Sequence, residues 1–190
     1  MKINNADYLT SVVSADKVIR DNVPEYAFVG KSNVGKSSLI NNLCNQKKLA
    51  KTSSSPGRTR MINYFSLNGG SARFVDLPGY GFSSAGKSFE LLWQTLMADY
   101  FSFSQSLKRV FLLLDVRHKP SPDDLLMQKY LYIHQIPTTV VVTKCDKLSG
   151  NQLNKAIQII ANEMCLGKAN IIAHSCESGI GKEKILEKMC

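Results

Sequence analysis

The sequence predicts an α/β fold with three layers, in which helices cover both faces of a mostly parallel six-stranded sheet with one antiparallel edge strand. Strand-like and helix-like segments alternate along the 190 residues, which is typical of a parallel sheet. Residues 109–115 and 137–144 contain continuous apolar runs, as expected of strands buried on both faces. Asn68-Gly69-Gly70 separates two further strand-like segments and predicts a hairpin, which would supply the antiparallel strand.

The expected strands are short apolar segments bounded by glycine, turn residues or polar loops. The first of them ends in a glycine, and the second and third flank the hairpin turn. The six strands are expected at residues 26–30, 62–67, 71–77, 109–115, 137–144 and 170–175.

The expected helices are segments in which apolar residues recur at helical spacing. Two polar or glycine-rich stretches, residues 46–60 and 77–88, are expected to be loops. No repeat, linker or low-complexity tract divides the chain, so we expect a single domain over 1–190, with residues 1–22 as an N-terminal extension and 23–190 as its core. The helices are expected at residues 36–45, about 89–103, 121–135, 151–164 and 179–188.

Composition narrows the class of protein and of partner. No stretch reaches the ~18 uninterrupted apolar residues of a membrane span, and the N-terminal residues lack the apolar core of a secretory signal, so we expect a cytoplasmic protein. The net charge of +9 leaves open either a polyanionic partner or ordinary solubility charge. The scattered cysteines have no CxxC spacing and argue against a disulfide framework or a zinc site; they are Cys44, Cys145, Cys165, Cys176 and Cys190.

A phosphate-binding motif follows the first strand and opens the first helix. Residues 30–37 read GKSNVGKS and match GxxxxGK[ST] in the context that this motif requires. Backbone N–H groups and the helix N-terminus would cradle the phosphates, Lys36 would reach the β- and γ-phosphates, and the Ser37 hydroxyl would bind Mg²⁺. The residues expected to contact nucleotide here are Gly30, Lys31, Ser32, Asn33, Val34, Gly35, Lys36, Ser37 and Ser38.

A second motif, Thr143-Lys144-Cys145-Asp146, follows the strand at 137–144 and resembles the [NT]KxD element of GTPases. Asp146 would accept hydrogen bonds from guanine N1–H and the 2-amino group, which adenine cannot donate, and sites of this kind can reject the wrong ligand by roughly 10⁴-fold. The aliphatic stem of Lys144 would lie along the base. A weaker match, whose backbone would contact guanine O6, consists of Ser175, Cys176 and Glu177.

Two loops match the switches of nucleotide-dependent proteins. Asp76-Leu77-Pro78-Gly79 has the form DxxG; Asp76 would hold Mg²⁺ through a water, and the Gly79 N–H would meet the γ-phosphate. Thr59 is the best-placed first-switch threonine and would ligate Mg²⁺ only while the γ-phosphate is present. Thr52 is a poorer candidate because it lacks the PGxT setting that Thr59 has in Pro56-Gly57-Arg58-Thr59.

With these elements in order, the chain resembles the EngB (YihA/YsxC) family of the TrmE–Era–EngA–EngB–septin-like GTPases. The stretches that carry the resemblance are GKSNVGKSSLINNL, SSSPGRTRMINYF, DLPGYGF, DVRHKPSPDD and TKCDK. The resemblance implies a P-loop GTPase domain that hydrolyses GTP, a role in large ribosomal subunit assembly, and a link to cell division and septation. The basic first-switch loop would suit contacts with rRNA phosphates, or it is a solvated loop.

Tyr80 stands where Ras-like proteins carry the glutamine that orients the attacking water, so we expect slow intrinsic hydrolysis whether or not Tyr80 simply points away. A partner could supply the missing charge stabilisation. Alternatively, Asn33 resembles the asparagine through which several relatives bind K⁺, or it only caps the loop. We expect Lys36, Thr59 and Asn33 to be the catalytic residues. We also expect the protein to be a monomer.

Two other function classes remain open. A P-loop kinase or ATPase acting on a small molecule would share the phosphate loop, but TKCD and DLPG disfavour it. A septum- or membrane-associated structural GTPase is the second alternative, disfavoured because the sequence lacks a basic amphipathic helix or a coiled coil.

Overall fold

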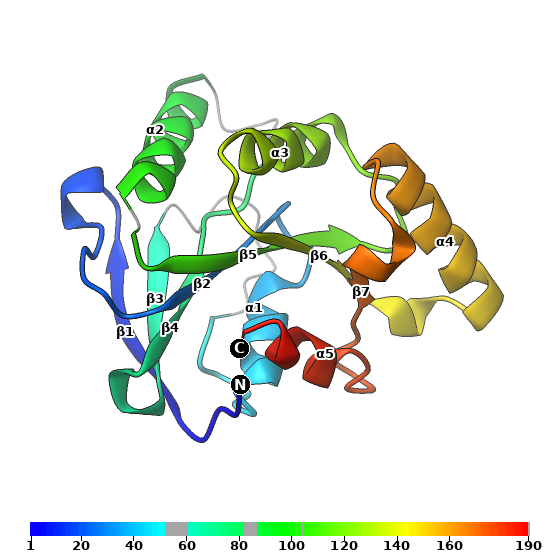
Figure 1. Cartoon of the computed structure of the whole chain (residues 1–190), viewed down its shortest axis with the longest axis horizontal. Coiled ribbons are helices and arrows are strands. Elements are labelled where there is room, and N and C mark those ends of the chain that lie inside the picture. The colour runs from blue at the N-terminus through cyan, green and yellow to red at the C-terminus, as the bar shows by residue number, and fades with distance from the viewer. Residues whose placement is uncertain (52–60, 82–86, 104, 190) are drawn as a thin grey trace.

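The computed structural model describes residues 1–51, 61–81, 87–103 and 105–189, and it has the α/β fold that the sequence predicts. A mixed sheet is covered by helices on both faces (Figure 1). Its strands are β1 (Ala6–Val12), β2 (Glu25–Gly30), β3 (Ile62–Leu67), β4 (Ala72–Asp76), β5 (Leu107–Asp115), β6 (Thr138–Thr143) and β7 (Ile171–Ala173). The helices are α1 (Lys36–Leu43), α2 (Lys87–Phe103), α3 (Pro122–Ile133), α4 (Gly150–Glu163) and α5 (Lys182–Glu187).

The sheet has seven strands in the order β1-β3-β4-β2-β5-β6-β7, so the expected number of six was wrong. Only β3 runs against its neighbours, and it pairs antiparallel with both β1 and β4. The antiparallel strand is therefore internal, and β1 forms the edge of the sheet instead. The segment 1–22, expected as an extension, contributes this strand. Its apolar residues alternate poorly because the middle of β1 is exposed or half-buried and only its end residues, Ala6 and Val12, are buried.

The hairpin between β3 and β4 forms where it was predicted. Asn68, Gly69 and Gly70 all have positive φ angles, of 48°, 68° and 93°. Three consecutive left-handed residues strongly favour glycine and asparagine, so the turn fixes the register that pairs Leu67 with Ala72.

The two faces of the sheet are packed by different helices. Along β5, Val110, Leu112 and Leu114 face a core that includes residues of α2, α3 and α4, while Phe111 and Leu113 face the core beneath α1 and α5. This is the two-residue period of a strand buried on both faces. In the part of the chain that the structure describes, no helix is long and apolar enough to cross a membrane.

The carboxyl ends of β2, β4, β5 and β6 share one edge of the sheet, because all four strands run parallel. The phosphate loop follows β2, the DxxG match follows β4 and TKCD follows β6, while the weaker match at 175–177 follows β7, which is parallel to β6. In an open α/β sheet this edge is where ligands bind.

Candidate nucleotide site

The phosphate loop is the turn between the end of β2 at Gly30 and the start of α1 at Lys36. Asn33 and Gly35 have positive φ angles, of 62° and 106°, and the amide of Val34 donates to the Lys31 carbonyl at 3.2 Å. A Cβ on Gly30 would lie 2.8 Å from the Leu113 carbonyl oxygen. The loop therefore curls tightly against β5, and glycine is required where it passes that strand.

Lys36 forms an ion pair with Asp76, which ends β4. The two side chains are only 10% and 5% exposed, and the register of the parallel strands places Asp76 beside Phe28 in β2. The predicted phosphate-binding cation and the predicted Mg²⁺-linked carboxylate thus lie together at the mouth of the phosphate loop.

The loop after β4 runs alongside the phosphate loop. Leu77 donates its amide to the Phe28 carbonyl at 3.0 Å, and the Ser32 amide donates to the Tyr80 carbonyl at 3.2 Å. A Cβ on Gly79 would lie 3.1 Å from Ser32 Oγ. The residues of the DxxG match, including Pro78, therefore lie close along the phosphate loop. Because backbone hydrogen bonds join the two loops, a movement of one loop would displace the other.

Tyr80, in the place of the glutamine, is turned toward α3 and buried, with only 6% of its surface exposed. Its hydroxyl donates to Asp124 Oδ1 at 2.7 Å, and Asp124 Oδ2 accepts from the amide and hydroxyl of Ser121, each at 2.7 Å. Burial, followed by the charge of Asp124, raises the pKa of Tyr80 well above its usual range, so the phenol stays a hydrogen-bond donor. Tyr80 thus joins the loop after β4, the predicted second switch, to the N-cap of α3.

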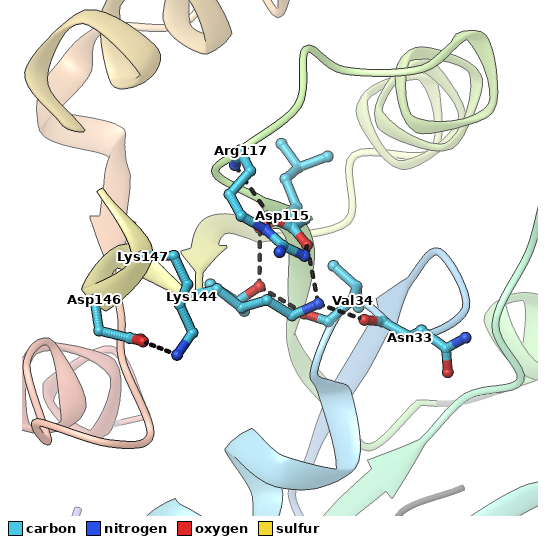
Figure 2. Close-up of polar contacts among 9 residues, drawn as sticks. Asn33, Val34, Asp115, Arg117, Lys144, Asp146 and Lys147 are labelled. Atoms are coloured by element: carbon cyan, nitrogen blue, oxygen red, sulfur yellow. Dashed lines mark hydrogen bonds and ion pairs between the residues drawn. The ribbon is translucent and has the colours of Figure 1, made fainter. Parts of the chain in front are cut away.

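The TKCD residues also contact the phosphate loop directly (Figure 2). Thr143 Oγ1 donates to the Val34 carbonyl at 2.6 Å, and Lys144 Nζ donates to the Asn33 carbonyl at 2.8 Å. These partners are 109 and 111 positions apart in the chain. The fold therefore brings together the two motifs predicted to bind phosphate and base.

Asp146 is held by the loop after β7. Ser175 Oγ donates to Asp146 Oδ1 at 2.7 Å and accepts from the amide of Glu177 at 3.2 Å. Lys147 Nζ lies 3.0 Å from Asp146 Oδ2. The hydrogen bond from Ser175, then that from Lys147, lowers the pKa of Asp146, so the carboxylate is ionised, as an acceptor of two guanine donors must be.

His174 connects the TKCD loop, the loop after β7 and helix α1. It is fully buried; its carbonyl accepts from the Cys145 amide at 3.3 Å, and its Nε2 lies 3.1 Å from Asn42 Oδ1 in α1. Burial, with a smaller effect of Lys182, lowers the pKa of His174 to about 4, so the ring is neutral near pH 7. Cys176 follows on the exposed side of the same loop.

Two carboxylates of the stretch DVRHKPSPDD, Asp115 and Asp124, had no predicted role. Asp115 ends β5 and contacts Lys144 Nζ at 2.9 Å, and Asp124 holds Tyr80. A hollow of about 290 Å³ lies between these residues and the phosphate loop. Its polar lining includes Lys31, Ser32, Asn33, Asp115, Arg117, His118, Lys119, Ser121, Asp124 and Lys144. The signal for both carboxylates was their place after a buried strand, at the edge where the other motifs lie.

Three predicted contacts, Gly57, Arg58 and Thr59, and the poorer candidate Thr52 lie outside the described residues. Among the residues described, no group of three or more His, Cys, Asp or Glu side chains could hold a metal ion. Two oxygen ligands among the described residues that could face a metal at the phosphate loop are the Ser37 hydroxyl and the Asp76 carboxylate, which pairs with Lys36. Such a sparse set of hard oxygens suits Mg²⁺, which is commonly held by one or two carboxylates together with substrate phosphates and water.

Replacing Tyr80 with phenylalanine should destabilise the protein, because it leaves the buried Asp124 carboxylate without one donor. We expect the free energy of unfolding in urea to fall by about 1–3 kcal/mol. Tyr132→Phe is the matched control, since Tyr132 lies on the same helix as Asp124 but is 83% exposed; its effect should stay within about 0.5 kcal/mol. Equal stabilities of the two variants would show that the Tyr80 hydroxyl contributes nothing.

The comparisons with known proteins agree on one family for this chain. A family model described as a 50S ribosome-binding GTPase matches residues 25–144. Relatives named "probable GTP-binding protein EngB" include one from Desulforamulus reducens, 46% identical over 98% of this chain and 92% of its own length. Another, from Heliobacterium modesticaldum, is 42% identical over 98% of this chain and 91% of its own length.

Solved structures show the same fold. A crystal structure described as a probable GTP-binding protein engB has a TM-score of 0.72 and 24% identity, covering 87% of this chain and 96% of its own. An Era variant from Aquifex aeolicus, bound to GDP and AlF4⁻, has a TM-score of 0.67 and 25% identity, covering 89% of this chain and 56% of its own. From the family model, these full-length relatives and the shared fold, it follows that the chain belongs to the EngB family of GTP-binding proteins and is an enzyme that hydrolyses GTP.

Proposed function

We propose that guanine nucleotide binds along the carboxyl edge of the sheet, with its phosphates in the loop 30–37 and its base between Lys144 and Asp146. The observation that carries this assignment is that Thr143 and Lys144 bind the phosphate-loop carbonyls of Val34 and Asn33. Because these hydrogen bonds join TKCD to the phosphate loop, the residues that would bind the base and those that would bind the phosphates are held together. Ser38 and the loop 175–177 complete the proposed contacts.

The residues that would hold Mg²⁺ are Ser37, Thr59 and, through a water, Asp76; bound with the nucleotide, the ion would neutralise charge that develops on the phosphates. Lys36 would exchange its ion pair with Asp76 for the β- and γ-phosphates. The same movement would free the Asp76 carboxylate to face the metal. This exchange keeps both buried charges paired before and after nucleotide binds, as a low-dielectric site requires.

Changing Asp146 to asparagine should reverse the choice of base. Affinity for GTP should fall about 10- to 100-fold, the cost of losing charged hydrogen bonds to guanine, and xanthosine triphosphate should gain, because its 2-oxo group accepts where guanine donates. Competition against a fluorescent nucleotide measures both. Asp123→Asn removes the same charge from an exposed position and should change neither; wild-type affinity for GTP in the Asp146 variant would overturn the assignment.

We propose that hydrolysis is slow without help from a further charge, because Tyr80 is held by Asp124 and offers no amide to orient water. Asn33 is one candidate to recruit that help by binding K⁺. Its backbone carbonyl accepts from Lys144, while its side chain extends away from Lys144 (Figure 2). The hollow beside Ser32 and Asn33 would also admit a group brought by a partner.

If Asn33 binds K⁺, GTP turnover should rise when K⁺ replaces Na⁺ at constant ionic strength, because the oxygens would be spaced for the larger ion. We expect an effect of about tenfold or more, equivalent to about 1.4 kcal/mol in the barrier. Asn33→Ala should remove the salt difference while GTP binding persists, and Asn151→Ala, an exposed change on α4, should keep it. The same rate in both salts would leave Asn33 as a loop cap.

We propose that the partner is the large ribosomal subunit and that the protein assists its assembly in the cytoplasm as a monomer. The family description, a 50S ribosome-binding GTPase, and the net charge of +9 support this role. Lys47, Lys48 and Lys51 are exposed at the start of the predicted first switch, and Arg58 and Arg60 follow in the sequence. An Era relative of this fold was solved with nucleotides 1506–1542 of 16S ribosomal RNA. The family resemblance also implies a contribution to cell division and septation, which we include in the proposal; the alternative is a septum- or membrane-associated structural GTPase without a ribosomal role.

Ribosome binding should depend on both nucleotide and salt. More protein should pellet with large subunits in a non-hydrolysable GTP analogue than in GDP, because only a γ-phosphate would order both switches. Raising salt from about 50 to 200 mM should weaken the binding steeply, since phosphate contacts release counterions. Equal pelleting in both nucleotides, unchanged by salt, would favour the septum-associated alternative.

A further inference from the structure

Asp115 is a carboxylate shared by two cations at the end of β5. Lys144 Nζ lies 2.9 Å from Asp115 Oδ2. On the other side, Arg117 donates from Nε at 2.9 Å, from Nη2 at 2.7 Å and from its amide at 3.1 Å. The Asp115 side chain is only 14% exposed. Partial burial alone would raise its pKa, but the hydrogen bonds from Arg117 and Lys144 hold the pKa of Asp115 well below its usual range.

The Lys144 side chain is held in place through its ammonium group, and Asp115 is the charged partner of that group. Its backbone is left-handed, with φ of 61°, and its ammonium lies between the Asp115 carboxylate and the Asn33 carbonyl (Figure 2). A lysine side chain has about 2 kcal/mol of rotamer entropy to lose when it is fixed. One neutral carbonyl is a weak anchor for such a chain, and an ionised carboxylate roughly doubles the strength of a hydrogen bond.

We propose that Asp115 is a positioning residue for guanine nucleotide binding, which holds the Lys144 side chain in place to form one wall of the base site. This inference rests on the proposed contact between Lys144 and the base. Asp115 itself touches no nucleotide; it acts by fixing the ammonium, so that the aliphatic stem is already laid out when the base arrives. Pre-organisation of this kind gains affinity by lowering the entropy lost on binding.

Arg117 provides an internal control, because it pairs with the same carboxylate but is 43% exposed. Among the described residues, its side-chain bonds run to Asp115 and not to Lys144 or the phosphate loop. Removing Arg117 leaves the whole charge of Asp115 to Lys144. If the ion pair between Arg117 and Asp115 had only a structural role, replacing either residue would weaken nucleotide binding to the same extent. If Asp115 positions Lys144, replacing Asp115 weakens binding and replacing Arg117 does not.

The first experiment compares Asp115→Asn with Arg117→Gln by titrating fluorescent GDP. Asp115→Asn should raise the Kd roughly two- to fivefold, the range for a partly exposed charge pair, and Arg117→Gln should leave it unchanged or lower it. Affinity for inosine diphosphate should fall by the same factor in Asp115→Asn, because the base face is affected and Asp146 is not. Equal losses in the two variants, or a changed ratio of guanosine to inosine nucleotide, would overturn the proposal.

A double-mutant cycle then tests whether Asp115 acts through Lys144. In a Lys144→Met background, which keeps an unbranched stem and removes the ammonium, Asp115→Asn should have no further effect on the Kd. If Asp115→Asn still weakens GDP binding in the Lys144→Met background, the positioning role is refuted. This outcome would also reveal a loss of affinity that comes from general destabilisation of the protein. If Lys144→Met binds GDP as tightly as the wild type, the proposed role of Lys144 fails; if it binds weakly while Asp115→Asn binds normally, only the inference about Asp115 fails.

Discussion

The tight turn of the phosphate loop, between the end of β2 and the start of α1, is the constraint on which the rest of this structure depends. Gly30 passes so close to the Leu113 carbonyl that a Cβ would lie 2.8 Å from it, and the left-handed Asn33 and Gly35 complete the turn. Because the loop is pressed against β5, its carbonyls are presented to the neighbouring strand ends. Those carbonyls, of Val34 and Asn33, accept the hydrogen bonds of Thr143 and Lys144.

Charge pairing follows from that crowding. Two lysines and several carboxylates meet at one edge of the sheet, where water is partly excluded and an unpaired charge would be costly. The structure pairs Lys36 with Asp76 and Lys144 with Asp115. Both carboxylates end parallel strands, so the strand directions that build the fold also supply the counter-ions of the site. In the proposed binding mode the Lys36 pair exchanges partners when phosphate binds, whereas the Lys144 pair persists.

The second switch is tied to the same edge through Tyr80. Its backbone pairs with the phosphate loop, and its hydroxyl binds the carboxylate that also caps α3. A residue that only pointed away from the nucleotide would be free to vary in position, but this one is fixed at both its backbone and its side chain. The geometry couples the switch to α3 and the adjoining hollow, so a partner bound there could affect the nucleotide loop by a short path.

The sequence by itself determined the alternation of strands and helices, the hairpin at residues 68–70 and the order of the nucleotide motifs, because these depend on local patterns of apolar residues and glycines. It could not determine the place of β1, since an edge strand that buries little apolar surface carries a weak pattern. Nor could it assign Asp115, Asp124 or the setting of Tyr80. Their partners are Lys144, Tyr80 and Ser121, which come from different strand ends and a helix cap. Only the tertiary structure decided those contacts, because they arise where parallel strands far apart in the chain end side by side.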